Sequence, residues 1–197
     1  MRVFLAGATG VIGTRLVPLL GEAGHSVAGL TRTPTKASVL EGLGAEPVVG
    51  DVFDREWLIT AVSAFGPDVV MHQLTDLPDE VSRVGEFTAA NARIRREGTS
   101  NLLEASRLSG ATRFLAQSVA WELPGDGGRS VAEMEALVLE FGGTVLRYGQ
   151  FYGEGTYHHS APPQPPRIHI EEAARRTLDA LEAGPGIVEV VENTRDR

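Results

Sequence analysis

The sequence contains no cysteine and only one lysine, Lys36, among its 197 residues. Without cysteine the chain can build neither a disulfide framework nor a thiolate metal site, and it has no cysteine nucleophile. No apolar run approaches the ~18 residues that cross a bilayer, and the opening apolar segment is too short for the core of a signal peptide. We therefore expect a cytoplasmic protein without a membrane partner.

Positive charge is scarce as well. The net charge is −8 and the pI is near 5.1, whereas a surface that binds nucleic acid is basic. We therefore expect no nucleic acid partner. Hydrophobic residues make up 42% of the chain and charged residues 22%, as in an ordinary globular protein. The length predicts a single domain over residues 1–197.

Short β-branched runs alternate with longer amphipathic segments along the chain, which is typical of a parallel sheet covered by helices. The predicted strands are 3–6, 26–30, 45–49, 68–72, 113–117, 144–147 and 187–191. The predicted helices are 11–23, 35–43, 55–64, 85–109, 131–140 and 170–183. The pattern predicts an α/β fold with a doubly wound, mostly parallel sheet and helices on both faces.

Three glycines lie between the first predicted strand and the first helix, in the run Gly7-Ala8-Thr9-Gly10-Val11-Ile12-Gly13. Glycines here allow a tight reversal, close approach of the backbone to a pyrophosphate, and close packing of helix on strand. The free amides and the positive end of the helix dipole would then meet the phosphates. We predict a Rossmann-type dinucleotide-binding turn whose cofactor-binding residues are Gly7, Thr9, Gly10, Val11, Ile12 and Gly13.

The end of the second predicted strand indicates which dinucleotide binds. NAD-binding proteins carry an acidic residue there for the ribose hydroxyl, and an arginine accommodates the 2′-phosphate of NADP. This chain has no acidic residue between Glu22 and Glu41, but it has Arg32 and Lys36. A guanidinium can grip phosphate oxygens with two hydrogen bonds. We predict NADP(H) as the cofactor, with NAD possible; the alternative is that both are ordinary surface charges.

Several motifs together resemble the short-chain dehydrogenase/reductase superfamily, in its extended or atypical branch of NAD-dependent epimerase/dehydratase-like proteins. The resemblance runs from Met1 to about Thr156 and returns at 168–174. It rests on the glycine turn and on Gly50-Asp51-Val52, Asp68-Val69-Val70-Met71-His72, Asn91, Gly98-Thr99-Ser100-Asn101-Leu102-Leu103 and Arg113-Phe114. It implies that Asn91 lies near the site. The further cofactor-binding residues that it implies are Asp51 and Val52 at the adenine, and His72, Gln73 and Leu74 along the cofactor. A turn residue at Asp51 and a packed histidine at His72 are the structural alternatives.

The family's catalytic residues are only partly present. Ser118 matches the active-site serine. The family's redox members pair a tyrosine with a lysine four residues later for acid–base catalysis, but the matching positions hold Val131 and Glu135, and no Tyr-x-x-x-Lys occurs in the chain. A carboxylate would raise the pKa of a neighbouring phenol. We predict Tyr152, on the nicotinamide side, as a replacement proton donor, with aromatic packing as the alternative.

The resemblance also implies an abbreviated C-terminal substrate region. Residues 157–167 contain four prolines, which predict a loop in place of much of the usual substrate lid. His158 and His159 lie in this loop without other ligand types, so we predict no metal site. His169 matches the segment that closes the substrate side. The helices 85–109 and 131–140 resemble the pair that forms dimer bundles, which makes a homodimer the expectation.

Three functions remain open from the sequence. The first is an atypical NADP-dependent oxidoreductase or epimerase that acts on a small hydroxyl or carbonyl compound. The second is a redox-inactive protein that binds NADP(H) as a sensor and contacts a protein partner. The third is a non-redox isomerase or cyclase on the same fold. The substrate cannot be named, because fold analogy does not supply it.

Overall fold

Seven parallel strands form the central sheet of the computed structural model, which describes residues 1–192. Their spatial order is β3-β2-β1-β4-β5-β6-β9. The strands are β1 Arg2–Ala6, β2 Ser26–Thr31, β3 Glu46–Val49, β4 Val69–His72, β5 Arg113–Val119, β6 Thr144–Tyr148 and β9 Gly186–Val190. The order reverses direction between β1 and β4, as in a doubly wound Rossmann-type sheet, and ligands bind outside the carboxyl ends of the strands at such a switch point.

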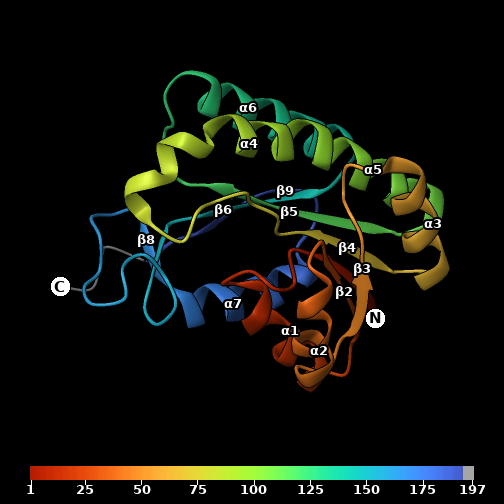
Figure 1. Ribbon diagram of the computed structural model, residues 1–197. Coiled ribbons are helices and arrows are strands. Elements are labelled where there is room, and N and C mark those ends of the chain that lie inside the picture. The colour runs from red at the N-terminus through yellow and green to blue at the C-terminus, as the bar shows by residue number, and fades with distance from the viewer. Residues whose placement is uncertain (193–197) are drawn as a thin grey trace.

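Helices cover both faces of this sheet (Figure 1). One face carries α1 Gly13–Glu22, α2 Ala37–Gly42 and α7 Ile170–Asp179. The other carries α3 Arg55–Phe65, α4 Thr88–Arg93, α5 Thr99–Ser109 and α6 Gly125–Glu140. Tight 3₁₀ turns lie at Pro34–Lys36, Val81–Phe87 and Ala180–Glu182, and a π turn at Ile94–Gly98 joins α4 to α5. The predicted fold class is therefore confirmed.

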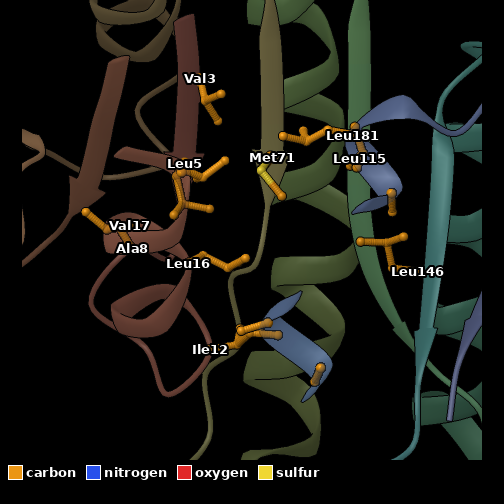
Figure 2. Packing of buried hydrophobic residues seen from close by; sticks show 14 of the residues in the cluster. Val3, Leu5, Ala8, Ile12, Leu16, Val17, Met71, Leu115, Leu146 and Leu181 are labelled. Atoms are coloured by element: carbon orange, nitrogen blue, oxygen red, sulfur yellow. The ribbon is translucent and has the colours of Figure 1, made fainter. Parts of the chain in front are cut away.

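Alternate residues of the strands build two hydrophobic cores, one on each face. Val3 and Leu5 of β1 pack with Leu16 of α1 in the first core, and Figure 2 shows these side chains beside Met71 and Leu115 of the neighbouring strands. Phe4 and Ala6 point to the second core, under α3 and α5. Because successive side chains of a strand point to opposite faces, continuous apolar runs such as 3–6 predict a sheet that is covered on both sides.

The largest differences between the predicted and the observed helices lie in two places. The expected helix 85–109 is divided into a 3₁₀ turn, α4, the π turn and α5. Helix α6 begins at Gly125 rather than at residue 131, although its first residues are rich in glycine. Gly128 permits this, because a Cβ there would lie 2.2 Å from the carbonyl oxygen of Leu123, and a tertiary ion pair from Asp126 holds the first turn.

The proline-rich segment is bracketed by a short second sheet that the sequence did not predict. Strand β7, Gln150–Tyr152, pairs in parallel with β8, Arg167–His169. The segment between them contains bends, turns and one isolated bridge between Tyr152 and His158. Within residues 1–192, no helix has the length and hydropathy needed to cross a membrane.

Candidate cofactor and active site

The glycine turn joins β1 to α1 at the switch point. Gly7 has a φ of 92°, and a Cβ there would lie 2.4 Å from the carbonyl oxygen of Gln73. A Cβ at Gly13 would lie 2.2 Å from the carbonyl oxygen of Gly7. Both positions therefore require glycine. Gly10 is exposed, and a Cβ there would meet only the Gly7 carbonyl oxygen, at 3.3 Å, so its backbone is open to a ligand.

Helix α1 begins without a cap. Ile12, its N-cap residue, makes no side-chain capping bond, and the first turn has no acidic residue. Within residues 1–192, the amides of Val11 and Ile12 donate to no carbonyl outside regular helices and strands, while the Gly10 amide closes the turn on the Gly7 carbonyl at 3.0 Å. Uncapped amides at the positive end of a helix dipole attract anions. Together with the half-buried Thr9, this turn fits the pyrophosphate of a dinucleotide.

Arg32 follows directly on β2, at the same edge of the sheet. Its Nη2 lies 2.8 Å from the Asp76 Oδ1, and its side chain is 62% exposed. The hydrogen bond with Asp76 raises the pKa of Arg32, partly offset by burial, and the charge of Asp51 raises this pKa further. Lys36 is exposed at the end of the 3₁₀ turn that follows. Two cationic side chains therefore stand at the place where a 2′-phosphate is expected.

Asp51 and Val52 follow β3. The Asp51 carboxylate accepts the Phe53 amide at 2.9 Å, so it stabilises its own turn. The Val52 side chain is buried in the second core, and its carbonyl accepts a hydrogen bond from the Asn101 side chain at 3.0 Å. Both residues lie at the carboxyl edge of the sheet. The hydrogen bond from the Phe53 amide is the one expected if Asp51 serves as a turn residue.

His72, the last residue of β4, is buried. Its Nδ1 accepts the Leu74 amide at 3.2 Å, so Nε2 carries the proton and donates to the Thr99 Oγ1 at 3.0 Å. Burial lowers the pKa of His72 to about 4, with a smaller contribution from the charge of Arg95. A neutral imidazole with both ring nitrogens hydrogen-bonded in this way is a packed strand-end residue, so its side chain is engaged within the protein.

Gln73 ends a chain of buried hydrogen bonds. Thr177 donates to the Ala173 carbonyl, so the Tyr148 hydroxyl must donate to Thr177 and accept from the Gln73 Nε2, which lies 3.2 Å away. This order leaves the Gln73 Oε1 as a buried acceptor without a partner among residues 1–192. Such atoms are rare in folded proteins. The main chain of Gln73 lies against Gly7 of the glycine turn, and a hydroxyl or amide of a dinucleotide bound there would satisfy the free acceptor.

The predicted serine forms part of an ionic cluster under α6. Ser118, Arg147 and Glu189 are register partners on β5, β6 and β9. From α6, the Glu135 carboxylate accepts two hydrogen bonds from Arg147, at 2.9 and 2.6 Å, and one from the Ser118 hydroxyl at 2.5 Å. Burial raises the pKa of Glu135, but the bonds from Arg147 and Ser118 outweigh it and hold the pKa below its ordinary 4.5. Glu135 is therefore ionised at neutral pH.

A recess of about 470 Å³ lies beside this cluster. Both positions that match the missing catalytic pair, Val131 and Glu135, contribute to its lining. The charged lining residues are Glu122, Glu135, Arg147 and Glu189, and the apolar ones include Val119, Ala120, Trp121 and Leu123. Three carboxylates against one guanidinium make the recess acidic.

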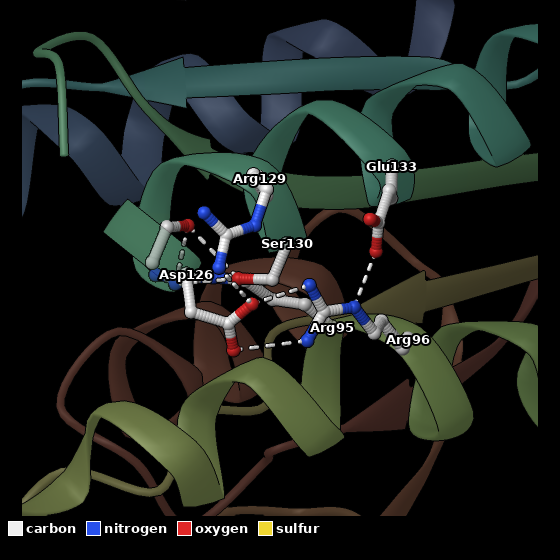
Figure 3. Close-up of polar contacts among 7 residues, drawn as sticks. Arg95, Arg96, Asp126, Arg129, Ser130 and Glu133 are labelled. Carbon is white, nitrogen blue, oxygen red and sulfur yellow. Dashed lines mark hydrogen bonds and ion pairs between the residues drawn. The ribbon is translucent and has the colours of Figure 1, made fainter. Parts of the chain in front are cut away.

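Ion pairs with the π turn hold α6 in place. Arg96 binds Asp126 through two hydrogen bonds, at 3.1 and 2.9 Å, and also pairs with Glu133 (Figure 3). Arg129 adds a longer contact to Asp126, at 3.2 Å. These contacts fix the start of α6, so they position the helix that presents Val131 and Glu135 to the recess.

Tyr152 on β7 has different partners from Ser118. Its hydroxyl donates to the Glu192 carboxylate, and its ring packs edge-on against His169 at a centroid distance of 5.1 Å. The hydrogen bond to Glu192 raises the pKa of Tyr152, which weakens it as an acid. His169 caps α7, accepting the Glu171 amide at its Nδ1. Among the described residues, Ser118 and Tyr152 share no hydrogen-bond partner.

The loop after β7 is tied to both sides of the switch point. Arg15 of α1 donates to the Glu154 carbonyl at 2.6 Å, and the Tyr157 hydroxyl donates to the Pro78 carbonyl in the loop after β4. The loop therefore contacts elements on both sides of the crevice. This fits the prediction of an abbreviated substrate side.

Sequence reasoning did not identify Asp76 or Glu189 as site residues, and it gave Arg147 no role of its own beyond membership of the segment on the nicotinamide side. Asp76 lies in an irregular loop, where no spacing rule applies. Arg147 and Glu189 join the recess only because β6 and β9 are neighbours in the sheet. The one available signal was the unusual Glu135, since a buried carboxylate requires a cationic partner.

Comparisons with known proteins agree with this architecture. The chain is 42% identical over 180 residues to a 3-diazoavenalumate denitrifying reductase of a Streptomyces species, covering 79% of this chain and 58% of the reductase. It is 33% identical over 116 residues to a 3-beta-hydroxysteroid dehydrogenase of Mycolicibacterium neoaurum, covering 58% of this chain and 31% of that enzyme. The chain thus spans less than two thirds of these relatives.

The solved structure of the UDP-glucose 4-epimerase of Thermus thermophilus, in complex with NAD, superposes with a TM-score of 0.79. The two share 23% identity, and the match covers 97% of this chain and 78% of the epimerase. At this identity the likeness shows the fold. In addition, residues 3–136 match the NAD dependent epimerase/dehydratase family. This chain belongs to the NAD dependent epimerase/dehydratase family.

Proposed function

We propose that this chain is an NADP(H)-dependent reductase that delivers hydride to an electron-poor, positively charged substrate without a tyrosine proton donor. One observation carries the proposal. In the recess, the two positions that match the family's tyrosine and lysine hold Val131 and an ion-paired Glu135. Valine has no proton to give, and Glu135 is ionised and engaged by Ser118 and Arg147.

The cofactor would lie along the carboxyl edge of the sheet. The uncapped amides of the glycine turn would bind its pyrophosphate, and Arg32, with Lys36 near it, would bind the 2′-phosphate. Asp51 and Val52 would lie at the adenine, and the free Oε1 of Gln73 would accept a hydrogen bond further along. NADP is preferred to NAD because no acidic residue ends β2.

The missing acid matters only for some substrates. Reduction of a carbonyl needs a hydride and a proton, whereas a cation needs the hydride alone. The bound dinucleotide would supply the hydride. An aryl diazonium cation that accepts it breaks its carbon–nitrogen bond, forms a carbon–hydrogen bond and releases dinitrogen, with no proton from the protein. The recess would favour such a cation through Glu122 and Glu189, which outweigh the single positive charge of Arg147.

The name of the Streptomyces relative supports this substrate class, since it describes a reductase that removes nitrogen from a diazo compound. Ser118 would act by holding the Glu135 carboxylate at 2.5 Å, so it fixes the charge of the recess rather than attacking the substrate. A redox-inactive NADP(H) sensor is the second candidate, because the lack of the tyrosine–lysine pair favours a sensor as much as it favours the proposed reductase.

The test is a reaction with NADPH deuterated at its transferable position. We expect a stable aryl diazonium to consume the nucleotide, with deuterium in the product arene and release of dinitrogen, at a rate well above that of a protein-free control. Aldehydes and ketones of similar size should react at least about 100-fold more slowly, the usual contribution of a positioned acid. Tight NADPH binding without turnover of either class would favour the sensor instead.

A further inference from the structure

Arg32 and Asp76 form an ion pair that spans the switch point. Arg32 follows β2, and Asp76 lies in the loop after β4. These two strands flank β1 on either side. The pair, at 2.8 Å, therefore joins the two sides of the crevice beyond the end of β1, where the glycine turn begins.

The position of Asp76 is set by its backbone. The Asp76 amide donates to the Asn91 Oδ1 at 3.0 Å, and the Asn91 Nδ2 donates to the Asp76 carbonyl at 2.7 Å. Asn91 itself is buried in α4. Because this clamp uses only the main chain of Asp76, the carboxylate is free to bind Arg32. Its side chain is 22% exposed, against 62% for Arg32.

We propose that Asp76 determines cofactor selectivity by competing with the 2′-phosphate of NADP(H) for Arg32. The inference rests on the proposed binding of a dinucleotide at the glycine turn. The guanidinium that would grip the phosphate is already engaged, and a carboxylate lies beside the phosphate's expected position. The phosphate of NADP(H) must displace Asp76 from Arg32 or share Arg32 with it. NAD(H) has no such phosphate and leaves the ion pair intact.

A second carboxylate strengthens the argument. Asp51 also acts on Arg32 through its charge. An incoming phosphate therefore meets one guanidinium that already balances two acidic neighbours. Removing either negative charge should favour the phosphate. Asp76 is the one in direct contact, and its side chain has no other hydrogen bond among the described residues. The structure thus assigns to Asp76 a restraint on NADP(H) binding.

The experiment measures dissociation constants for NADPH and NADH by calorimetry, without any turnover. Asp76→Asn should bind NADPH about fivefold more tightly than the original chain, as expected for a partly exposed ion pair, and NADH within about twofold. The substitution keeps the main-chain clamp to Asn91, so we expect the variant to fold. In the Arg32→Ala background, Asp76→Asn should no longer tighten NADPH.

A matched control separates local from overall charge. Glu104→Gln also removes one negative charge and one ion pair with arginine, but on α5, and it should change neither constant. Weaker NADPH binding by Asp76→Asn would show that Asp76 orients Arg32 for the phosphate, and would overturn the proposal. Equal tightening in the Arg32→Ala background would overturn it as well. If the original chain bound neither nucleotide, the proposed function would fail together with this inference.

Discussion

The glycine turn and the α6 recess lie at the same edge of one sheet, but they meet the family's requirements unequally. At the turn, Gly7 and Gly13 cannot take a side chain without a clash against main-chain atoms. In the recess, the two positions matched by resemblance to the family's tyrosine and lysine hold Val131 and Glu135. Nucleotide binding therefore depends on backbone geometry that the fold itself needs, whereas the chemistry depends on side chains that the fold can exchange.

The ion pair between Glu135 and Arg147 shows how the fold accommodates a carboxylate at a position matched to the family's lysine. Glu135 would be costly to bury alone, and Arg147 from the neighbouring strand compensates its charge. The region thus keeps a charged group under α6 but loses the ability to give a proton. Single substitutions can perturb the turn and the recess separately.

The largest effect is expected at the glycine turn. Gly7→Ala should lower the free energy of unfolding by about 3 kcal/mol, because it adds a main-chain clash to the cost of a positive φ. Gly24→Ala is the control, since Gly24 also has a positive φ but a Cβ added there would meet no atom within 4 Å. It should cost about 1 kcal/mol. Urea unfolding measures both, and equal losses would contradict the steric argument.

A smaller, pH-dependent effect is expected in the recess. The pKa of Glu135 is held below 4.5, so the pair stabilises the fold above that pH and its contribution disappears as pH falls through the lowered value. Arg147→Met leaves a buried carboxylate whose pKa burial now raises, so its unpaired charge is costly at neutral pH and relieved in acid.

We expect a loss of about 2 kcal/mol at neutral pH, less than for a fully buried pair because Arg147 is partly exposed. Urea unfolding at neutral and acidic pH should show this loss shrinking in acid. Arg129→Met breaks an exposed pair with Asp126 and should change stability far less than Arg147→Met does. A loss for Arg147→Met that is independent of pH would refute the pairing argument.

The smallest effect is expected at Tyr152. If the reaction needs no proton donor, Tyr152→Phe should change the rate of diazonium reduction by less than about twofold, whereas removing a true general acid costs about 100-fold or more. Tyr157→Phe removes another tyrosine hydroxyl, in the loop that follows β7, and it serves as the reference for the rate of Tyr152→Phe. A loss of 100-fold confined to Tyr152→Phe would restore this residue as the acid.

Much of the fold was predictable, and the site was predictable in part. The seven sheet strands and the glycine turn follow from local patterns, because apolar periodicity and glycine spacing act over a few residues. The start of α6 was missed because Gly125, Gly127 and Gly128 favour a loop locally, and a distant ion pair with Arg96 overrides that preference. The pair β7–β8 was missed because each strand has only three residues.

The parallel sheet, the glycine turn and the absence of a tyrosine–lysine pair can all be read from the sequence alone. These features depend on residues that are neighbours in the chain. The contact of Asp76 with Arg32 and the neutralisation of Glu135 by Arg147 required the folded structure. Those contacts join residues 44 and 12 positions apart, and they form only after strand order and helix packing have brought separate elements to one edge of the sheet.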